Sequence, residues 1–205
     1  MKVEEKEDFI EKYLKEVGLI TEHISREDVD KVIRLLYEAW KEKRQIFTAG
    51  NGGSASTATH FASDLAKFTS VDGKHRIKAL ALTDNMPWIT AITNDLGWGN
   101  VYVEQLKNLM DEGDVFIAIS VHGGSGEDKA GPWSQNLLAA ARFIKEKKGK
   151  LIGLVGFDGG VLKKISDACI VVPANSTPYV EGFHLVLTHL ICARLKELIE
   201  KSQVE

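Results

Sequence analysis

The sequence is poor in the residues that mark several protein classes. Its 205 residues include two cysteines, Cys169 and Cys192, which lack the CxxC spacing of a zinc knuckle. Both lie in apolar stretches, which favours buried free thiols over a disulfide and indicates a reducing compartment. No run of about 18 apolar residues occurs, and the acidic, mixed N-terminus lacks the apolar core of a signal peptide. We therefore expect a soluble, cytoplasmic protein with no membrane partner.

An excess of basic residues is also missing. Lysine and arginine number 26 against 29 acidic residues, which gives a net charge of −3, and no basic stripe is evident. Nucleic acid is therefore not an expected partner. Apolar residues make up 44% and charged residues 27% of the chain, which excludes a disordered protein.

Short apolar runs alternate with helical patterns from residue 45 onward. The runs cover residues 46–49, 79–82, 115–119, 151–155 and 168–172. Each is short, continuous and rich in valine, isoleucine, leucine or alanine, as in strands covered on both faces. Helical spacing covers residues 54–67, 87–93, 100–110, 134–147 and 180–201. This alternation predicts an α/β fold, a three-layer α/β/α sandwich around a five-stranded parallel sheet.

Two further helices are predicted before the first strand. The first covers about residues 5–17 and is expected to stop at Gly18. The second begins at Ser25, where Ser25 and Asp28 resemble a capping box. A sheet of this kind does not need these helices to close, so we predict that residues 1–44 form a helical oligomerisation segment. The alternative is that they cover one face of the sheet in the same subunit.

Two glycine-rich loops follow predicted strands. Residues 50–54 read Gly-Asn-Gly-Gly-Ser and lead into a helix, and residues 120–126 contain serines, glycines and His122. Glycines allow close backbone approach and a helix N-terminus attracts anions, so the two loops together predict a phosphate site without a Walker motif. A plain tight turn is the alternative for either loop alone. Residues 126–135 are expected to be a loop insertion.

Four side chains on two predicted helices have the spacing of metal ligands. His60 and Asp64 are four residues apart and share a helix face, and Glu181 and His189 are eight apart on roughly one side of the last helix. Two imidazoles and two carboxylates suit zinc or another divalent cation. The alternatives are a helical His–Asp pair without metal, and a Glu181 that only stabilises a helix N-terminus.

The motif from Phe47 to Ser54, followed by His60-Phe-Ala-Ser-Asp64-Leu, resembles the sugar isomerase (SIS) domain, in its phosphoheptose isomerase branch. Matches at residues 93–97 and 156–160 and in the final helix extend the resemblance over almost the whole chain. The resemblance implies a single SIS domain over residues 1–205.

The resemblance also implies an activity. Enzymes of this branch interconvert sedoheptulose 7-phosphate and a heptose 7-phosphate through an enediol, as homotetramers with zinc. The implied substrate-binding residues, to which we add Gly53 and His122, are Asn51, Gly52, Gly53, Ser54, Asp95, Ser120, His122 and Ser125. The implied metal ligands are His60, Asp64, Glu181 and His189, and the implied proton-transfer pair is Asp64 and His189.

Several positions depart from the family pattern. The family glutamate is Asp64 here, one methylene shorter, and the family glutamine ligand is Glu181, which adds charge. The serine- and threonine-rich loop has Val121 and His122 in place of two hydroxyl residues. With the 126–135 insertion, these changes predict that the substrate can differ from that of the family.

A non-catalytic member of the same family is the alternative. A SIS-domain adaptor or a sugar-phosphate-binding protein needs the scaffold and the loops but no metal. The replication-initiator-associating adaptor lacks the two histidines that this chain has as His60 and His189. Their presence favours an enzyme.

Overall fold

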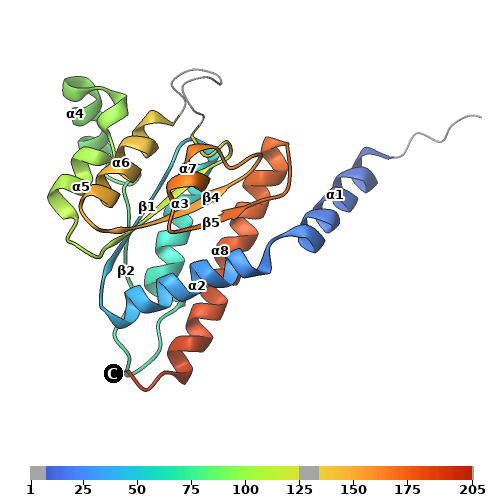
Figure 1. The fold of residues 1–205 in the computed structure, drawn as a ribbon, viewed down its shortest axis with the longest axis horizontal. Coiled ribbons are helices and arrows are strands. Elements are labelled where there is room, and N and C mark those ends of the chain that lie inside the picture. Colours follow the sequence, from blue (N-terminus) through green and yellow to red (C-terminus); the bar gives the residue numbers. More distant parts are fainter. Residues whose placement is uncertain (1–7, 125–133, 205) are drawn as a thin grey trace, which may run out of the picture.

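The computed structural model of the protein describes residues 8–124 and 134–204. Its centre is a five-stranded, fully parallel sheet in the order β2-β1-β3-β4-β5 (Figure 1). The strands are β1 (Gln45–Gly50), β2 (Lys78–Ala81), β3 (Val115–Ser120), β4 (Lys150–Val155) and β5 (Ala168–Val171). Every strand lies within one residue of its prediction at either end, so the five apolar runs are confirmed as strands.

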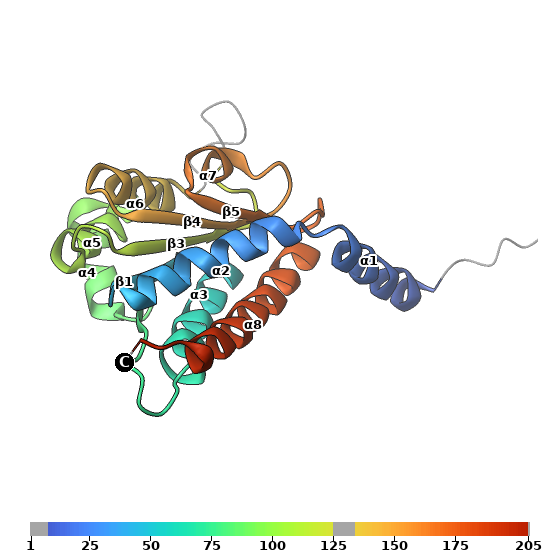
Figure 2. The ribbon, with the colours of Figure 1, turned by 60° about the horizontal axis from the view of Figure 1, so that its bottom comes forward.

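Helices cover both faces of this sheet, which confirms the three-layer sandwich (Figure 2). They are α1 (Phe9–His23), α2 (Arg26–Lys41), α3 (Gly53–Ser63), α4 (Met86–Leu96), α5 (Val103–Leu109), α6 (Gln135–Glu146), α7 (Gly160–Ile165) and α8 (Thr177–Lys201). α2, α3 and α8 pack on one face, and α4, α5, α6 and α7 on the other. No helix in residues 8–124 and 134–204 has the length and apolar content needed to cross a membrane.

The strands are apolar throughout because both of their faces are buried. In β1, Ile46 packs with the α2, α3 and α8 layer, whereas its neighbour Phe47 packs with the opposite layer. In β3, Ile117 and Phe116 divide in the same way, and all six residues of this strand are buried. Alternate side chains pointing to opposite apolar layers give a continuous rather than an alternating pattern.

The strand order creates one switch point, between β1 and β3. The chain leaves β1 toward β2 on one side and later returns to β3 on the other. In open parallel sheets, ligands bind beyond the carboxyl ends of the strands at such a point. The loop after Gly50 and the loop after Ser120 both begin there, so the fold brings the two glycine-rich loops together.

The N-terminal helices differ from each other in packing. The Ser25 hydroxyl accepts a hydrogen bond from the Asp28 backbone N–H at 3.2 Å, which confirms the predicted start of α2. α2 packs into the core, whereas α1 projects away from the sheet (Figures 1 and 2). The predicted stop at Gly18 is wrong, because α1 continues to His23. A helix tolerates an internal glycine at a cost of about 1 kcal/mol, and nothing near Gly18 forces the chain to turn.

The sequence patterns missed three short features of the described chain, one of which is the 3₁₀ turn Trp98–Asn100. α7 has six residues, too few for a helical period to show. Asp64–Phe68 form a π-helical turn that continues α3, in which the Thr69 N–H donates to the Asp64 carbonyl at 3.2 Å. Turns of this kind are often found at functional sites, and this one begins at a predicted ligand.

Candidate active site

The first part of the site is the start of α3. After β1 the chain turns at Gly52, whose φ of 56° and ψ of −126° are open only to glycine. α3 begins at the next residue, so its first N–H groups and its positive dipole end lie at the switch point. The predicted glycine loop therefore forms the N-terminal cradle that anions favour.

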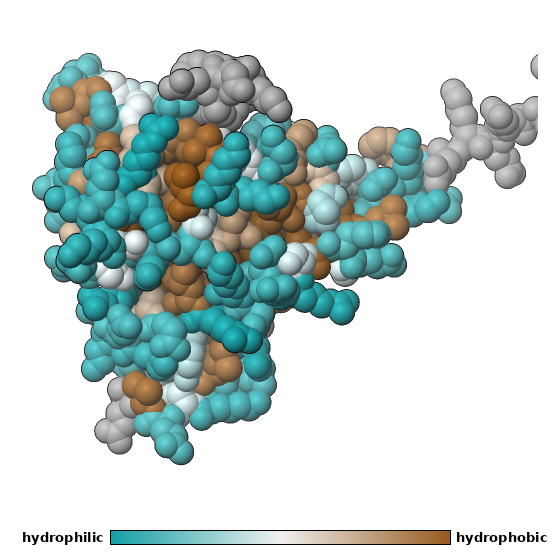
Figure 3. Space-filling model, in the orientation of Figure 1, coloured by the Kyte–Doolittle hydropathy of each residue, from teal (hydrophilic) through white to brown (hydrophobic). Residues whose placement is uncertain are grey.

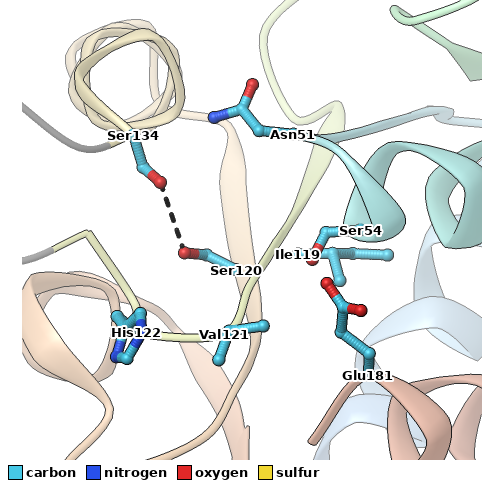
Figure 4. A pocket seen from close by; sticks show the side chains of 8 residues that line it. All are labelled: Asn51, Ser54, Ile119, Ser120, Val121, His122, Ser134 and Glu181. Atoms are coloured by element: carbon cyan, nitrogen blue, oxygen red, sulfur yellow. Dashed lines mark hydrogen bonds between the residues drawn. The ribbon is translucent and has the colours of Figure 1, made fainter. Parts of the chain in front are cut away.

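A cavity of about 140 Å³ lies beside this cradle (Figure 4). We call it the serine cavity; its lining residues are Asn51, Ser54, Ile119, Ser120, Val121, His122, Ser134 and Glu181. Ser54 of α3, Ser120 of β3 and Ser134 directly before α6 bring three hydroxyls to it. Ser54 is 3% exposed, and its hydroxyl has no hydrogen-bond partner in the part of the chain that the structure describes. These donors suit an oxyanion, and no lysine or arginine is among the described lining residues.

Ser134 is a site residue that the sequence analysis missed. Its hydroxyl oxygen lies 3.5 Å from that of Ser120, and the two point toward each other (Figure 4). Ser134 precedes α6 but does not cap it, and its φ of 58° is unusual for a residue other than glycine. The sequence prediction placed the second loop serine at Ser125, which lies outside the described residues. The available signal was that a serine, Ser134, is the first residue of the helical pattern of residues 134–147. A serine at that position is typical of an ordinary helix cap.

Asn51 lines the cavity, but its amide is held by the protein. The Asn51 Nδ2 donates to the Asn136 Oδ1 at 3.0 Å, and the Asn136 Nδ2 donates to the Asn51 Oδ1 at 2.8 Å. The Tyr102 hydroxyl donates to the Gly50 carbonyl and lies 3.4 Å from the Asn51 Oδ1. These contacts fix the glycine loop against α5 and α6.

His122 borders the cavity on the side away from α3 (Figure 4). Its ring lies 4.2 Å, centroid to centroid, from the ring of Phe157. Phe157 has a positive φ of 53°, a conformation that is an outlier for a bulky residue. The loop after β4 thus orients the imidazole at the edge of the cavity.

A second polar group lies further along α3. The Asp64 Oδ2 is 3.3 Å from the His60 Nε2 and 3.4 Å from the His189 Nδ1 of α8, and the two imidazole rings are 4.9 Å apart. One ligand atom from each residue lies within 4.8 Å of the others, so we call these residues the His–Asp cluster. Their side chains are 45%, 22% and 55% exposed for His60, Asp64 and His189. Two imidazoles and a carboxylate at this separation fit a divalent metal ion.

Glu181 does not belong to this cluster in the structure. Its carboxylate lies in the serine cavity against the start of α3, where a Cβ atom on Gly53 would come within 2.8 Å of it (Figure 4). Glu181 makes no hydrogen bond or ion pair with any residue in 8–124 and 134–204. Three of the four predicted ligands are therefore together, and the fourth faces the other part of the site.

Asp95 lies apart from both groups. It is exposed near the end of α4 and accepts a hydrogen bond from the Asn94 Nδ2 at 2.7 Å. A larger cavity of about 540 Å³ lies on the other side of the glycine loop, between α4 and the loop. Asn94 lines it together with Trp98, whereas Asp95 does not.

His184 is buried in α8 and takes no part in either group. The ring is fully buried and approaches the backbone of Val155 without forming a hydrogen bond of ordinary geometry. Burial lowers the pKa of His184 to about 4, because the charged form has no solvation there. His184 faces the core, whereas His189, five residues later in α8, is exposed.

Comparison with known proteins gives one family. Residues 12–156 match the model of the SIS domain. The lincomycin biosynthesis protein LmbN from Streptomyces lincolnensis is 38% identical over 183 residues, which are 87% of this chain and 66% of that protein. A phosphoheptose isomerase from Sulfurimonas denitrificans is 36% identical over 174 residues, which are 85% of this chain and 82% of the enzyme.

Solved structures of phosphoheptose isomerases are also similar to this chain. The phosphoheptose isomerase GmhA from Neisseria gonorrhoeae superposes with a TM-score of 0.80 at 27% identity and covers 92% of this chain and 97% of its own. A phosphoheptose isomerase from Francisella tularensis gives a TM-score of 0.81 at 23% identity, over 92% of this chain and 96% of its own, which bears on the fold alone.

Proposed function

Because the chain belongs to the phosphoheptose isomerase branch of the SIS domain family and is a sugar-phosphate isomerase, we propose that it interconverts sedoheptulose 7-phosphate and a heptose 7-phosphate. The reaction is a metal-assisted proton transfer through an enediol. The observation that carries the proposal is that α3 has an anion cradle at its start, while His60 near its end and Asp64 directly after it join His189 of α8 in the His–Asp cluster. Ser54 and His60 are separated by six residues, about 9 Å of helix. A phosphorylated sugar of several carbons can reach from one to the other.

The phosphate occupies the serine cavity in this proposal. Ser54, Ser120 and Ser134 donate hydrogen bonds to its oxygens, and Gly52 and Gly53 keep the backbone close. Asn51 holds the loop through Asn136. The remaining predicted substrate contacts stay part of the proposal: His122 at the cavity edge, Ser125 in the second loop, and Asp95 at the sugar hydroxyls.

The His–Asp cluster is the metal site in this proposal. His60, Asp64 and His189 hold a zinc or other divalent cation, with Glu181 as a further ligand. When bound, such a cation stabilises negative charge that develops on the sugar oxygens. Its support is the donor set itself, with two imidazoles and one carboxylate whose ligand atoms lie within 4.8 Å of one another.

Asp64 and His189 form the proton-transfer pair. Because metal ligation competes with base function, Asp64 is a ligand in one state and the base in another. An aldose–ketose isomerisation moves one proton between C1 and C2 and one between the two oxygens on those carbons. A carboxylate is a base for the carbon-bound proton, and an imidazole both gives and takes the oxygen-bound proton near neutral pH. The Asp64 Oδ2 and the His189 Nδ1 are 3.4 Å apart, which is close enough for the two groups to pass a proton between them during the reaction.

A homo-oligomer, in the form of a tetramer, completes the proposal. α1 projects from the body and shows both apolar and hydrophilic surface (Figures 2 and 3). Its residues Phe9, Ile10 and Leu14 are 76%, 64% and 63% exposed. An apolar stripe of this kind on a projecting helix suits burial against another copy of the chain. Within the oligomerisation segment of residues 1–44, α1 is therefore the part that contacts the other subunit, whereas α2 covers the sheet of its own subunit.

The test is incubation of the purified protein with ketose phosphates of five to seven carbons in deuterated water. The proposal expects deuterium at C2 of the aldose with the seven-carbon substrate, read by NMR, and stoichiometric metal in the protein. A non-catalytic SIS-domain adaptor or sugar-phosphate-binding protein gives no exchange with any of these sugars.

A further inference from the structure

We propose that Glu181 couples the serine cavity to the metal site. The carboxylate occupies the anion position at the start of α3. A phosphate monoester displaces it toward the His–Asp cluster, where it becomes an additional metal ligand. The inference rests on the proposed function for the phosphate and the metal, and it assigns to Glu181 a positioning role in addition to ligation.

The position of the carboxylate is the first argument. Its two oxygens lie 2.7 and 2.8 Å from the point where a Cβ atom of Gly53 would be, so the side chain rests directly on the first turn of α3. The positive end of a helix dipole stabilises a carboxylate there. Glu181 has no hydrogen bond or ion pair to any described residue, so no partner resists its movement. Glycine at residue 53 leaves the space for it.

Competition for one cavity is the second argument. Glu181 lines the same cavity of about 140 Å³ as the hydroxyls of Ser54 and Ser120. A phosphate dianion bound to these donors would lie within a few ångströms of the carboxylate, in a partly buried space where like charges repel strongly. None of the described residues that line the cavity is a lysine or an arginine. No side chain of those types therefore offsets the repulsion between the phosphate and the Glu181 carboxylate. Phosphate binding therefore drives the carboxylate out.

The charge of the His–Asp cluster is the third argument. With both imidazoles neutral, the cluster has one negative charge, so a divalent cation there keeps a net positive charge that attracts a second carboxylate. Zinc takes four ligands, of which the cluster supplies three, so Glu181 competes with water for the fourth position. Glu181 and His189 are eight residues apart on α8, about 12 Å along its axis. Both side chains lean toward the N-terminus of α8, so the Glu181 carboxylate must swing back along the helix to reach the cluster.

Linkage makes the consequence reciprocal. If the phosphate monoester sends Glu181 to the metal, it raises metal affinity, and metal raises the affinity for the phosphate monoester by the same factor. Removing the carboxylate abolishes the coupling. It also removes the competitor from the serine cavity, so the metal-free protein binds a phosphate monoester more tightly.

The experiment is calorimetry on the full chain with Co²⁺ and glycerol 3-phosphate, a phosphate monoester that the enzyme cannot isomerise. We expect saturating glycerol 3-phosphate to raise the Co²⁺ affinity of the wild type about tenfold, within the usual range of coupling between sites. We expect no such increase in Glu181→Ala. Without metal, Glu181→Gln binds glycerol 3-phosphate several-fold more tightly than the wild type. Glu200→Gln, at an exposed position of α8, has the same charge change and serves as the control.

The outcomes separate the two proposals. If the wild type binds Co²⁺ and glycerol 3-phosphate independently, or if Glu181→Ala keeps the full coupling, the role of Glu181 is wrong and the proposed function stands. An unchanged or weaker affinity of metal-free Glu181→Gln for glycerol 3-phosphate also overturns it. A wild type that binds neither probe overturns the proposed function together with the coupling. Circular dichroism of each variant checks that the fold is retained.

Discussion

Asn51 and Asn136, which are 85 residues apart in the sequence, hydrogen-bond to each other through both of their amide groups, at 3.0 and 2.8 Å. Asn51 belongs to the glycine loop at the start of α3, and Asn136 lies two residues beyond Ser134 at the start of α6. The pair therefore fixes the distance between two parts of the serine cavity. The sequence predicts that Asn51 binds the substrate, but in the structure its amide connects the glycine loop to the start of α6.

Removing this brace should loosen the cavity. In Asn136→Ala, Asn51 loses both hydrogen bonds in a partly buried setting, so we expect a loss of about 1–3 kcal/mol in the free energy of unfolding. We also expect a higher KM for the sugar phosphate with a smaller change in kcat. Urea unfolding and steady-state kinetics measure these effects. Asn108→Ala, at an exposed position of α5, is the control, and equal behaviour of the two variants contradicts the prediction.

Ser134→Ala should weaken phosphate binding more than Ser125→Ala does. The Ser134 hydroxyl lies 3.5 Å from that of Ser120 in the serine cavity, and one lost hydrogen bond to a charged ligand corresponds to about a tenfold or larger rise in KM. Kinetics on sedoheptulose 7-phosphate compare the two variants. If Ser125→Ala has the larger effect, the prediction for Ser134 is wrong.

Asp64→Asn should abolish turnover and leave the fold intact. The variant loses a metal ligand and a proton-transfer group, and the loss of a general base alone lowers the rate by about 10²–10⁴-fold. The NMR exchange assay measures turnover, and metal analysis shows how much of the effect comes from lost metal. Asp72→Asn, at an exposed position, is the matched control. Unchanged turnover in Asp64→Asn rejects its role.

Acid should destabilise the protein through His184. Burial lowers the pKa of His184 to about 4 from 6.5, so the unfolded chain binds a proton at a pH at which the folded chain does not. The neutral, buried His184 therefore leaves the free energy of unfolding at its full value above pH 6.5. As the pH drops from 6.5 toward 4, the free energy of unfolding falls by about 3 kcal/mol in total.

The test compares unfolding of the wild type and His184→Leu at several pH values between 6.5 and 4. The acid-induced loss should be smaller in His184→Leu by about 3 kcal/mol, since leucine does not titrate. His23→Gln, which removes an exposed histidine, should behave as the wild type does. Parallel curves for the wild type and His184→Leu would show that His184 does not contribute.

Leu14→Glu should reduce the oligomeric state. Leu14 is 63% exposed on the projecting α1, and a charge there opposes burial of the apolar stripe against another subunit. Light scattering after gel filtration gives the mass of each species. Lys12→Glu on the same helix is the control. If Leu14→Glu keeps the mass of the wild type, α1 does not contribute to the subunit contact.

The sequence alone determined the layered fold and the pairing on α3. Strands buried on both faces must be apolar along their whole length, so five short apolar runs separated by helical spacing predicted the parallel sheet almost residue by residue. His60 and Asp64 are four residues apart on one helix, so local geometry was enough to place them together. Gly18 misled the prediction because helix propensity is a weak local preference that the rest of α1 outweighs.

The distant residues that complete the site follow from how the elements pack. Ser134 reaches the serine cavity because α6 begins beside the end of β3, which no local pattern records. His189 and Glu181 share a side of α8, yet one joins the His–Asp cluster and the other faces the start of α3. The packing of α8 against α3 sets that division, because about 12 Å of helix places the two side chains at opposite ends of the site.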